Sequence, residues 1–256
     1  MRQLRARPPR APWPFALSLL ATLALSLGSA GLAAADSPPA AHRGSQQTGQ
    51  DLQRGEDGWQ ALIQGDSAPL LTGWKHPGLP AGWTVHDGVL SKGGPVDDLV
   101  STRKYKDFDL RLEWKIGKEG NSGIFYRATH QYDEIYWTGP EYQLLDDQNA
   151  PDGKHRITAA GSVYGMYPAP PTGLAHPYGQ WNTARIVVRG DHVTYWMNGH
   201  RIVDYDLHSP AWKKRVAGSK FAAYPGYGMA AEGLIGIQGN HPGAVAIRNM
   251  RIRILP

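Results

Sequence analysis

Short segments in which apolar and polar residues alternate recur along the chain from about residue 57 onward. In the clearest, 109–116, apolar residues at the even positions alternate with charged residues at the odd ones. Because the side chains of a strand point alternately to its two faces, this pattern is typical of a strand with one buried face. No stretch sustains helical periodicity for more than two turns, so the sequence predicts a mostly β chain.

Two dipeptides mark tight turns between such segments. Asp87-Gly88 lies between 83–86 and 89–91, and Asn198-Gly199 joins 193–197 to 201–203. Both dipeptides favour the left-handed conformations of a two-residue hairpin. The pattern predicts further strands at 120–127, 138–147, 184–188, 233–238 and 244–254. Many short antiparallel strands at this spacing predict an all-β, two-sheet jelly-roll sandwich, with a closed barrel as the alternative.

The first 35 residues have the organisation of a secretory signal. Four arginines precede the apolar run 15–27, and Ala33-Ala34-Ala35 resembles a cleavage site. The run is shorter than the roughly 20 residues of a membrane span, so we expect an exported chain, periplasmic or secreted, without a membrane anchor. Residues 36–56, rich in Pro, Ala, Gln and Ser, are expected to form a flexible leader. A single domain is expected at 57–256.

Removal of the signal changes the charge. The chain has 27 basic and 22 acidic residues, and the signal takes four arginines and no acid, so 27 − 4 = 23 basic residues remain against 22 acidic ones. A formal charge of about +1 gives no indication of a nucleic-acid partner. Because the chain has no cysteine, the stability of an exported domain must come from a packed core.

Polar side chains fall on two of the expected strands. Arg127 shares a face of 120–127 with Phe125, and Glu141 shares a face of 138–147 with Gln143. If the two faces meet, a guanidinium group stands beside a carboxylate and a carboxamide. Such a face suits a sugar better than a core, although a simple cross-strand ion pair would have the same pattern.

Two long stretches, 146–161 and 209–232, are rich in loop-forming residues, and long loops of this kind are often functional. The cations at 213–215 are interpreted as a solvated face without a partner. Four residues of the first stretch could attract calcium, but their spacing does not match the usual calcium-loop pattern, so no metal or other cofactor is expected. These four residues are Asp146, Asp147, Asn149 and Asp152.

A series of motifs extends over about 57–255. They are Gly58-Trp59-Gln60-Ala61-Leu62, Leu71-Thr72-Gly73-Trp74, Gly82-Trp83 with Asp87-Gly88-Val89-Leu90, Phe108-Asp109-Leu110-Arg111-Leu112-Glu113-Trp114, Asn121-Ser122-Gly123-Ile124 with Arg127, Gly139-Pro140-Glu141-Tyr142-Gln143-Leu144-Leu145-Asp146, Gly179-Gln180-Trp181-Asn182, Trp196-Met197-Asn198-Gly199 and Gly236-Ile237-Gln238. In these motifs and their order the chain resembles the 3-keto-disaccharide hydrolase domain family. The resemblance implies a concanavalin-A-like lectin/glucanase sandwich whose concave sheet holds carbohydrate. The chain departs at Gln238-Gly239-Asn240-His241-Pro242, where the family commonly has Gln-Asp-His-Gly.

The resemblance also implies an oxidised glycoside as substrate. A ketone at C3 makes the C2 hydrogen acidic, so that a base can remove it and the C1 substituent can leave by elimination, with water addition completing a net hydrolysis. This chemistry needs a base, an acid and a group that holds the developing oxyanion. We expect His241 and Glu141 to act as base and acid, and Arg127 to hold the oxyanion or other substrate oxygens.

Other side chains are candidates for holding the sugar. Amides and carboxylates suit its hydroxyl groups, and an aromatic ring suits its apolar face. The candidates of these kinds are Gln143, Glu113, Asn182, Trp137, Asp146 and Gln238.

Two other functions fit the same fold. A retaining glycosidase places two carboxylates about 5 Å apart, but the position two residues after Glu141 is the amide Gln143, and Asp146 could reach the face only across a bulge. A non-catalytic carbohydrate-binding module would need the amides and an aromatic platform but no base.

Overall fold

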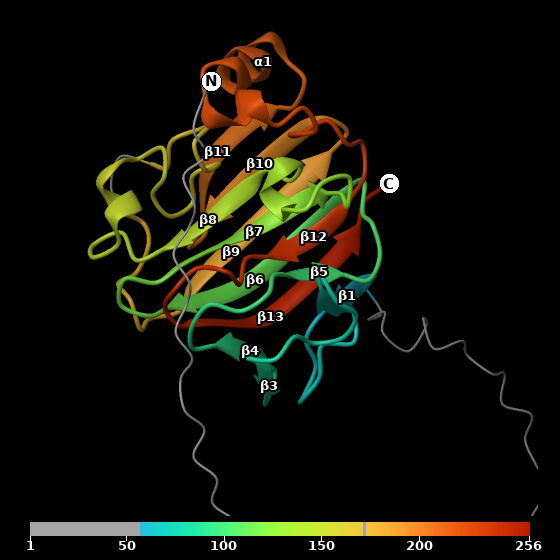
Figure 1. Cartoon of the computed structure of the whole chain (residues 1–256), viewed down its shortest axis with the longest axis vertical. Helices are drawn as coiled ribbons and strands as arrows, with labels where there is room; N and C mark the ends of the chain where they lie inside the picture. Colours follow the sequence, from blue (N-terminus) through green and yellow to red (C-terminus); the bar gives the residue numbers. More distant parts are fainter. Residues whose placement is uncertain (1–56, 171–172) are drawn as a thin grey trace, which may run out of the picture. The chain divides into compact units, whose positions relative to one another are not determined.

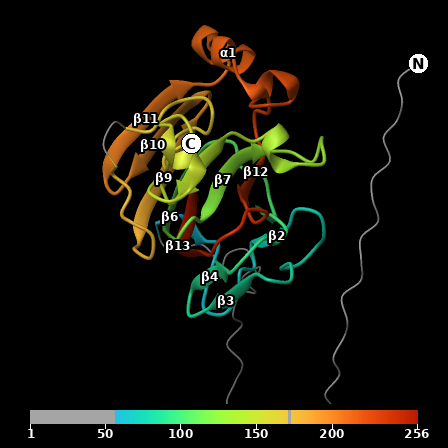
Figure 2. The same ribbon diagram turned by 60° about the vertical axis from the view of Figure 1, so that its left-hand side comes forward.

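The computed structural model describes residues 57–170 and 173–256, whose strands form two antiparallel sheets (Figures 1 and 2). The larger sheet has eight strands in the order β11-β10-β9-β6-β13-β4-β3, with β1 paired to β13, and the smaller has five in the order β2-β5-β12-β7-β8. The predicted two-sheet sandwich is therefore confirmed and the barrel alternative is wrong. The expected signal and leader lie outside the described residues, so cleavage and export stay predictions.

The two longest strands are neighbours near the middle of the larger sheet. That sheet contains β1 (Trp59–Ala61), β3 (Thr84–His86), β4 (Val89–Lys92), β6 (Phe108–Ile116), β9 (Asn182–Arg189), β10 (His192–Met197), β11 (His200–Asp206) and β13 (Val245–Ile254). The smaller sheet contains β2 (Leu71–Gly73), β5 (Leu99–Ser101), β7 (Asn121–Ala128), β8 (Glu141–Leu145) and β12 (Leu234–Ile237). The helical segments are η2 (Ile135–Trp137), η3 (Pro151–Lys154), α1 (Pro210–Ala217) and η4 (Lys220–Ala223).

Both predicted hairpins form. Asp87 and Gly88 have φ angles of 48° and 74°, and Asn198 and Gly199 have 48° and 81°. These left-handed conformations allow a two-residue turn to join strands that twist to the right. The hairpins fix the registers of β3 with β4 and of β10 with β11.

The core lies between the sheets. The even residues of β6 are buried there, together with Ile124 of β7, Tyr142 of β8 and Ile237 of β12. The odd residues of β6 lie on the outer face of the larger sheet, as the alternation predicts. In the smaller sheet, Phe125 pairs with Glu141, so these two side chains share its outer face, opposite the core.

One of the long connections contains a helix that packs against the end of the sandwich. The stretch 209–232 contains α1, which begins where Ser209 Oγ accepts a hydrogen bond from Trp212 N at 3.1 Å. In both views α1 lies at one end of the sheets, near β10 and β11 (Figures 1 and 2). Trp212 is buried between the rings of Tyr205 and Tyr227, at centroid distances of 5.4 and 5.6 Å. No helix among the described residues is long and apolar enough to cross a membrane.

Candidate active site

A cavity of about 420 Å³ lies against the outer face of the smaller sheet. Its floor comes from β7, β8 and the residues after β12. Its walls come from η2, from the segment 152–164 and from the segment 220–224, so both long connections predicted to be functional contribute to it. The lining residues are Asn121, Tyr136, Glu141, Gln143, Asp152, Tyr164, Lys220, Phe221, Tyr224, Gln238, Asn240 and His241. The structure thus brings four predicted site residues together, namely Glu141, Gln143, Gln238 and His241.

Glu141 begins β8 and is 7% exposed. Its carboxyl group lies over Gly123 of the neighbouring strand, where any side chain would collide with it. Burial raises the pKa of Glu141 from 4.5 to about 8; Lys220 opposes the shift, and the carboxylates of Asp98 and Asp152 add to it. At neutral pH this carboxyl group is therefore protonated and can donate a proton.

Gln143 lies next to Glu141 on the same face. With its carboxamide oriented so that the nitrogen donates, Gln143 hydrogen-bonds Glu141 Oε1 and the Ser122 carbonyl oxygen, both at 3.1 Å. The bond to Oε1 leaves the other oxygen of the carboxyl group to carry the proton. Gln238 is also buried, and among the described residues its side-chain oxygen has no hydrogen-bond partner. It is free to accept from a sugar hydroxyl.

His241 lies on the loop that follows β12, half-buried at the cavity wall. Burial lowers its pKa below 6.5; Asp152 opposes the shift, and the cations Lys92 and Lys220 add to it. The imidazole is therefore neutral at pH 7 and able to accept a proton. His241 reaches the cavity although Asn240 stands where the family commonly has an acidic residue.

Two buried charges hold this loop in place. Lys92 Nζ donates to the carbonyl oxygens of His241 at 2.8 Å and Gly243 at 3.1 Å. Asp98 Oδ1 accepts from the backbone N–H groups of Gly239 at 2.6 Å and Asn240 at 3.2 Å. One ammonium and one carboxylate thus fix the two sides of the segment that carries His241.

An aromatic wall faces these polar groups. Tyr136, Tyr164, Phe221 and Tyr224 line the cavity, and Lys220 Nζ lies 4.5 Å from the centre of the Tyr164 ring. The prediction that Trp137 itself lines the site is wrong. Trp137 stacks on Tyr224 at a centroid distance of 5.3 Å and supports the wall from behind.

Arg127 is not beside Glu141, contrary to the prediction. The pairing of β12 with β7 is irregular between Leu234 and Gly236, and Arg127 has a φ of 52°, so strict alternation fails at the end of β7. Its guanidinium group is 1% exposed and donates to the Gly190 carbonyl oxygen, with Asp191 at 3.6 Å. It connects β7 to the turn between β9 and β10.

Three further candidates lie away from the cavity. Glu113 is on the outer face of the larger sheet, where it accepts hydrogen bonds from Arg248 at 2.8 Å and Asn249 at 2.6 Å. Asn182 accepts from the His176 N–H at 2.7 Å and holds a loop. Asp146 accepts from the Glu119 N–H at 2.8 Å and so stabilises a turn. Each satisfies polar groups of the fold instead of facing the site.

The sequence did not single out Lys220, Tyr164 or Tyr136 for the site, and it considered Asp152 only as a calcium ligand. Asp152 Oδ2 accepts from Tyr164 Oη at 3.3 Å across the cavity wall. Asp152 and Lys220 lie on the two long connections. The length and composition of these connections were the sequence features that could have indicated site residues there.

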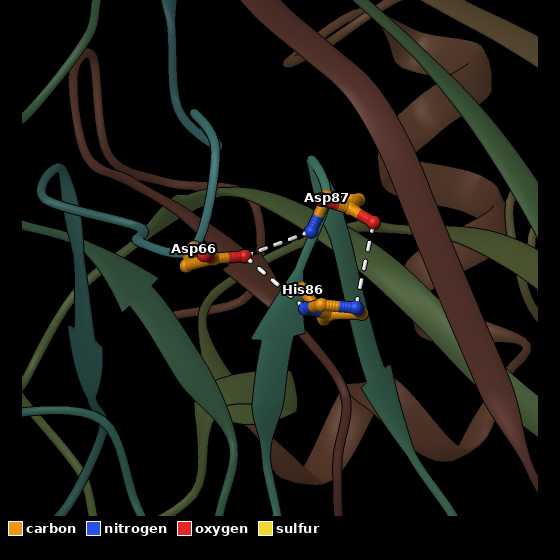
Figure 3. A group of neighbouring side chains, drawn as sticks. All are labelled: Asp66, His86 and Asp87. Atoms are coloured by element: carbon orange, nitrogen blue, oxygen red, sulfur yellow. Dashed lines mark hydrogen bonds and ion pairs between the residues drawn. The ribbon is translucent and has the colours of Figure 1, made fainter.

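One cluster with metal-ligand chemistry stands out among the described residues: Asp66 on the loop between β1 and β2, with His86 and Asp87 at the β3–β4 turn (Figure 3). Both ring nitrogens of His86 already face carboxylates, Nδ1 to Asp66 at 3.3 Å and Nε2 to Asp87 at 3.4 Å. The Asp87 N–H also donates to Asp66 at 2.9 Å. All three residues are exposed. Their contacts with one another hold the β3–β4 turn against the loop that carries Asp66, and this structural role explains the cluster.

The chain is similar to known proteins over most of its described part. Residues 58–253 match the family model of the 3-keto-α-glucoside-1,2-lyase-like domain. A 3-keto-disaccharide hydrolase of Bacteroides thetaiotaomicron is 34% identical over 234 residues, which cover 78% of this chain and 79% of that protein.

Two crystal structures from Parabacteroides distasonis, each described as a candidate glycosyl hydrolase, share the fold. One has a TM-score of 0.73 and 30% identity, covering 82% of this chain and 98% of the other. The second has a TM-score of 0.62 and 25% identity, covering 77% and 99%. These matches agree with the two antiparallel sheets of the predicted sandwich.

Proposed function

Because the chain belongs to the family of 3-keto-α-glucoside-1,2-lyase-like domains, we propose that it cleaves the glycosidic bond of 3-keto-glycosides, 3-keto-disaccharides among them. The observation that carries the proposal is the pair Glu141 and His241. Both line one cavity, and burial shifts their pKa values in opposite directions, so that each is uncharged at neutral pH. A protonated carboxyl and a neutral imidazole are an acid and a base ready for use.

The first half of the reaction is an elimination. The imidazole of His241 accepts the C2 proton, and the electron pair of the broken C–H bond passes to the C3 ketone as an enolate. As the carbonyl re-forms, a C1–C2 double bond forms and the C1–O bond breaks. Glu141 gives its proton to the departing oxygen, which leaves as an alcohol and leaves an unsaturated keto sugar behind.

The second half reverses the roles. Glu141, now a carboxylate, takes a proton from water, and the hydroxide adds to C1. The imidazolium of His241 returns a proton to C2. The net reaction is hydrolysis, and both groups end in their starting state.

The oxyanion at C3 needs a positive partner, and Arg127 does not supply it. Lys220 is the cation that lines the cavity, and we assign it this role. The aromatic wall would receive the apolar face of the sugar. Gln143 and Gln238 would hold its hydroxyl groups.

A retaining glycosidase is the second candidate, and one observation favours it. Asp152 joins Glu141 in the cavity, so that two carboxylates do meet there although they are not on one strand. Such an enzyme would need one of the two ionised as a nucleophile and would cleave an ordinary disaccharide. A carbohydrate-binding module would bind either sugar without cleaving it.

One comparison separates the three. The described domain is incubated with a 3-keto-disaccharide and with its unoxidised parent, and product is followed by chromatography. We expect cleavage of the keto form only, because only the ketone acidifies C2. Cleavage of the parent at a similar rate would support the glycosidase, and binding without cleavage of either would support the module.

A further inference from the structure

A second, larger cavity lies on the opposite side of the sandwich. It has a volume of about 790 Å³ and crosses β13, β6, β9 and β10 on the outer face of the larger sheet. It shares no lining residue with the candidate active site. A cavity of this size is within the range of ligand clefts, so it could take a ligand of its own.

The groove is positively charged. Arg111, Arg185 and Arg251 line it, and Glu113 is the lining carboxylate. Arg248 lies beside Glu113, with its Nε 2.8 Å from the carboxylate, and this pair is neutral. The positive charge of the other three arginines is therefore not balanced by Glu113.

A buried carboxylate organises two of these arginines. Asp109 is 1% exposed and accepts two hydrogen bonds from Arg185, at 2.8 and 2.9 Å, and two from Arg111, at 3.1 and 3.3 Å. One negative charge thus holds two guanidinium groups at the floor of the groove and neutralises one of them. With Arg251, which is exposed, the groove retains an excess of about two positive charges.

The groove also offers the contacts that a sugar needs. The half-buried indole of Trp196 lines it and stacks with Arg185 at 4.6 Å. Thr183 and Asn249 add a hydroxyl and a carboxamide to the lining. An aromatic face, hydroxyl-binding groups and guanidinium groups together match a sugar that carries an anionic group.

We propose that this groove binds an acidic oligosaccharide, with arginines facing its carboxylate or sulfate groups and Trp196 against a sugar ring. The near-neutral charge expected after signal removal argues against nucleic acid, whose affinity depends on many cations. The groove would anchor a glycan on the face opposite the active site. The proposal does not depend on the reaction proposed for that site.

The test is calorimetric titration of the described domain with an oligogalacturonate, with the same chain as its neutral methyl ester, and with a sulfated oligosaccharide of equal length. We expect at least tenfold weaker binding of the neutral ester. Arg251→Glu and Trp196→Ala should each weaken binding of the acidic chain at least tenfold. Arg185 is left intact, because its removal would strand the buried Asp109.

Lys104→Glu is the matched control: it makes the same charge change at an exposed site outside the groove, and should change the affinity less than twofold. Thermal melting checks that each variant is folded. Preference for the carboxylated or the sulfated chain identifies the anion. The proposal is wrong if none of the oligosaccharides binds, if Trp196→Ala binds normally, or if a polyglutamate peptide binds as well as the acidic sugar.

Discussion

Glu141 and His241 are held by the fold in the protonation states that their task requires. Exposed in water at pH 7, a glutamate is ionised, whereas the buried carboxyl of Glu141, with its pKa near 8, is not. His241 is kept neutral by burial and by the nearby cations. The same cavity thus makes an acid of the carboxyl group and a base of the imidazole.

Substitution tests these roles. Glu141→Gln and His241→Gln should each lower kcat about 10²- to 10⁴-fold on a 3-keto-disaccharide, because each removes a proton-transfer group while keeping a similar shape. The exposed residues Glu232 and His200 provide matched controls, as Glu232→Gln and His200→Gln, and these should leave kcat unchanged. Full activity of either cavity variant would remove that residue from the mechanism.

The raised pKa of Glu141 has a consequence for stability with a defined sign. In the unfolded chain the group ionises near pH 4.5, but in the folded protein only near pH 8, so stability falls as the pH rises through this range. Glu141→Gln removes this loss. Urea unfolding should show that the free energy of unfolding of the variant, relative to that of the parent, increases by up to about 4–5 kcal/mol as the pH rises from 4.5 to 8.5. A difference that does not change with pH would contradict the buried, neutral carboxyl group.

At the scale of elements, the site depends on a loop after β12 that has no regular structure of its own. Lys92 of β4 and Asp98, just before β5, bind its backbone and so set where His241 lies. Burial lowers the pKa of Lys92 to about 8 and raises that of Asp98 to about 6. Both groups use their hydrogen bonds to hold the backbone of this loop.

Loosening this loop should impair turnover before it impairs folding. Lys92→Met removes the ammonium that binds the loop carbonyl groups, so we expect kcat to fall about 10-fold or more at temperatures where melting shows the variant folded. Asp98→Asn keeps an acceptor oxygen, so it should lower kcat less than Asp98→Ala does. Lys104→Met is the exposed control. Unchanged kcat in Lys92→Met would show that the loop is positioned without this anchor.

At the scale of the whole molecule, the sequence predicted those features that depend on residues close together along the chain, namely the strands and the tight turns. The alternation in β6 and the turns at Asp87-Gly88 and Asn198-Gly199 were enough to predict the strands and the sandwich. Alternation placed Glu141 and Gln143 on one strand face, and the resemblance added His241 and Gln238. The structure gathers all four at one cavity. Export and the signal are still sequence-based predictions.

What the sequence did not predict depends on contacts between distant segments. Arg127 turns away from the site because of an irregular register with β12 and a left-handed backbone, neither of which its neighbours reveal. Lys220 and Asp152 reach the cavity from long connections whose paths are set by packing. The segments 71–73 and 99–101 form strands too short for an alternating pattern to show.

The central claim is that the C1–O bond breaks by elimination after loss of the C2 proton. Cleavage of a 3-keto-disaccharide in D₂O, followed by mass spectrometry and NMR at early times, tests it most directly. A sample without enzyme and one with enzyme and product alone correct for exchange that occurs outside turnover. The imidazolium N–H of His241 exchanges with D₂O before a proton returns to C2, so the account predicts one deuterium at C2 of each released keto sugar. Product that retains hydrogen at C2 would contradict it and indicate direct displacement at C1.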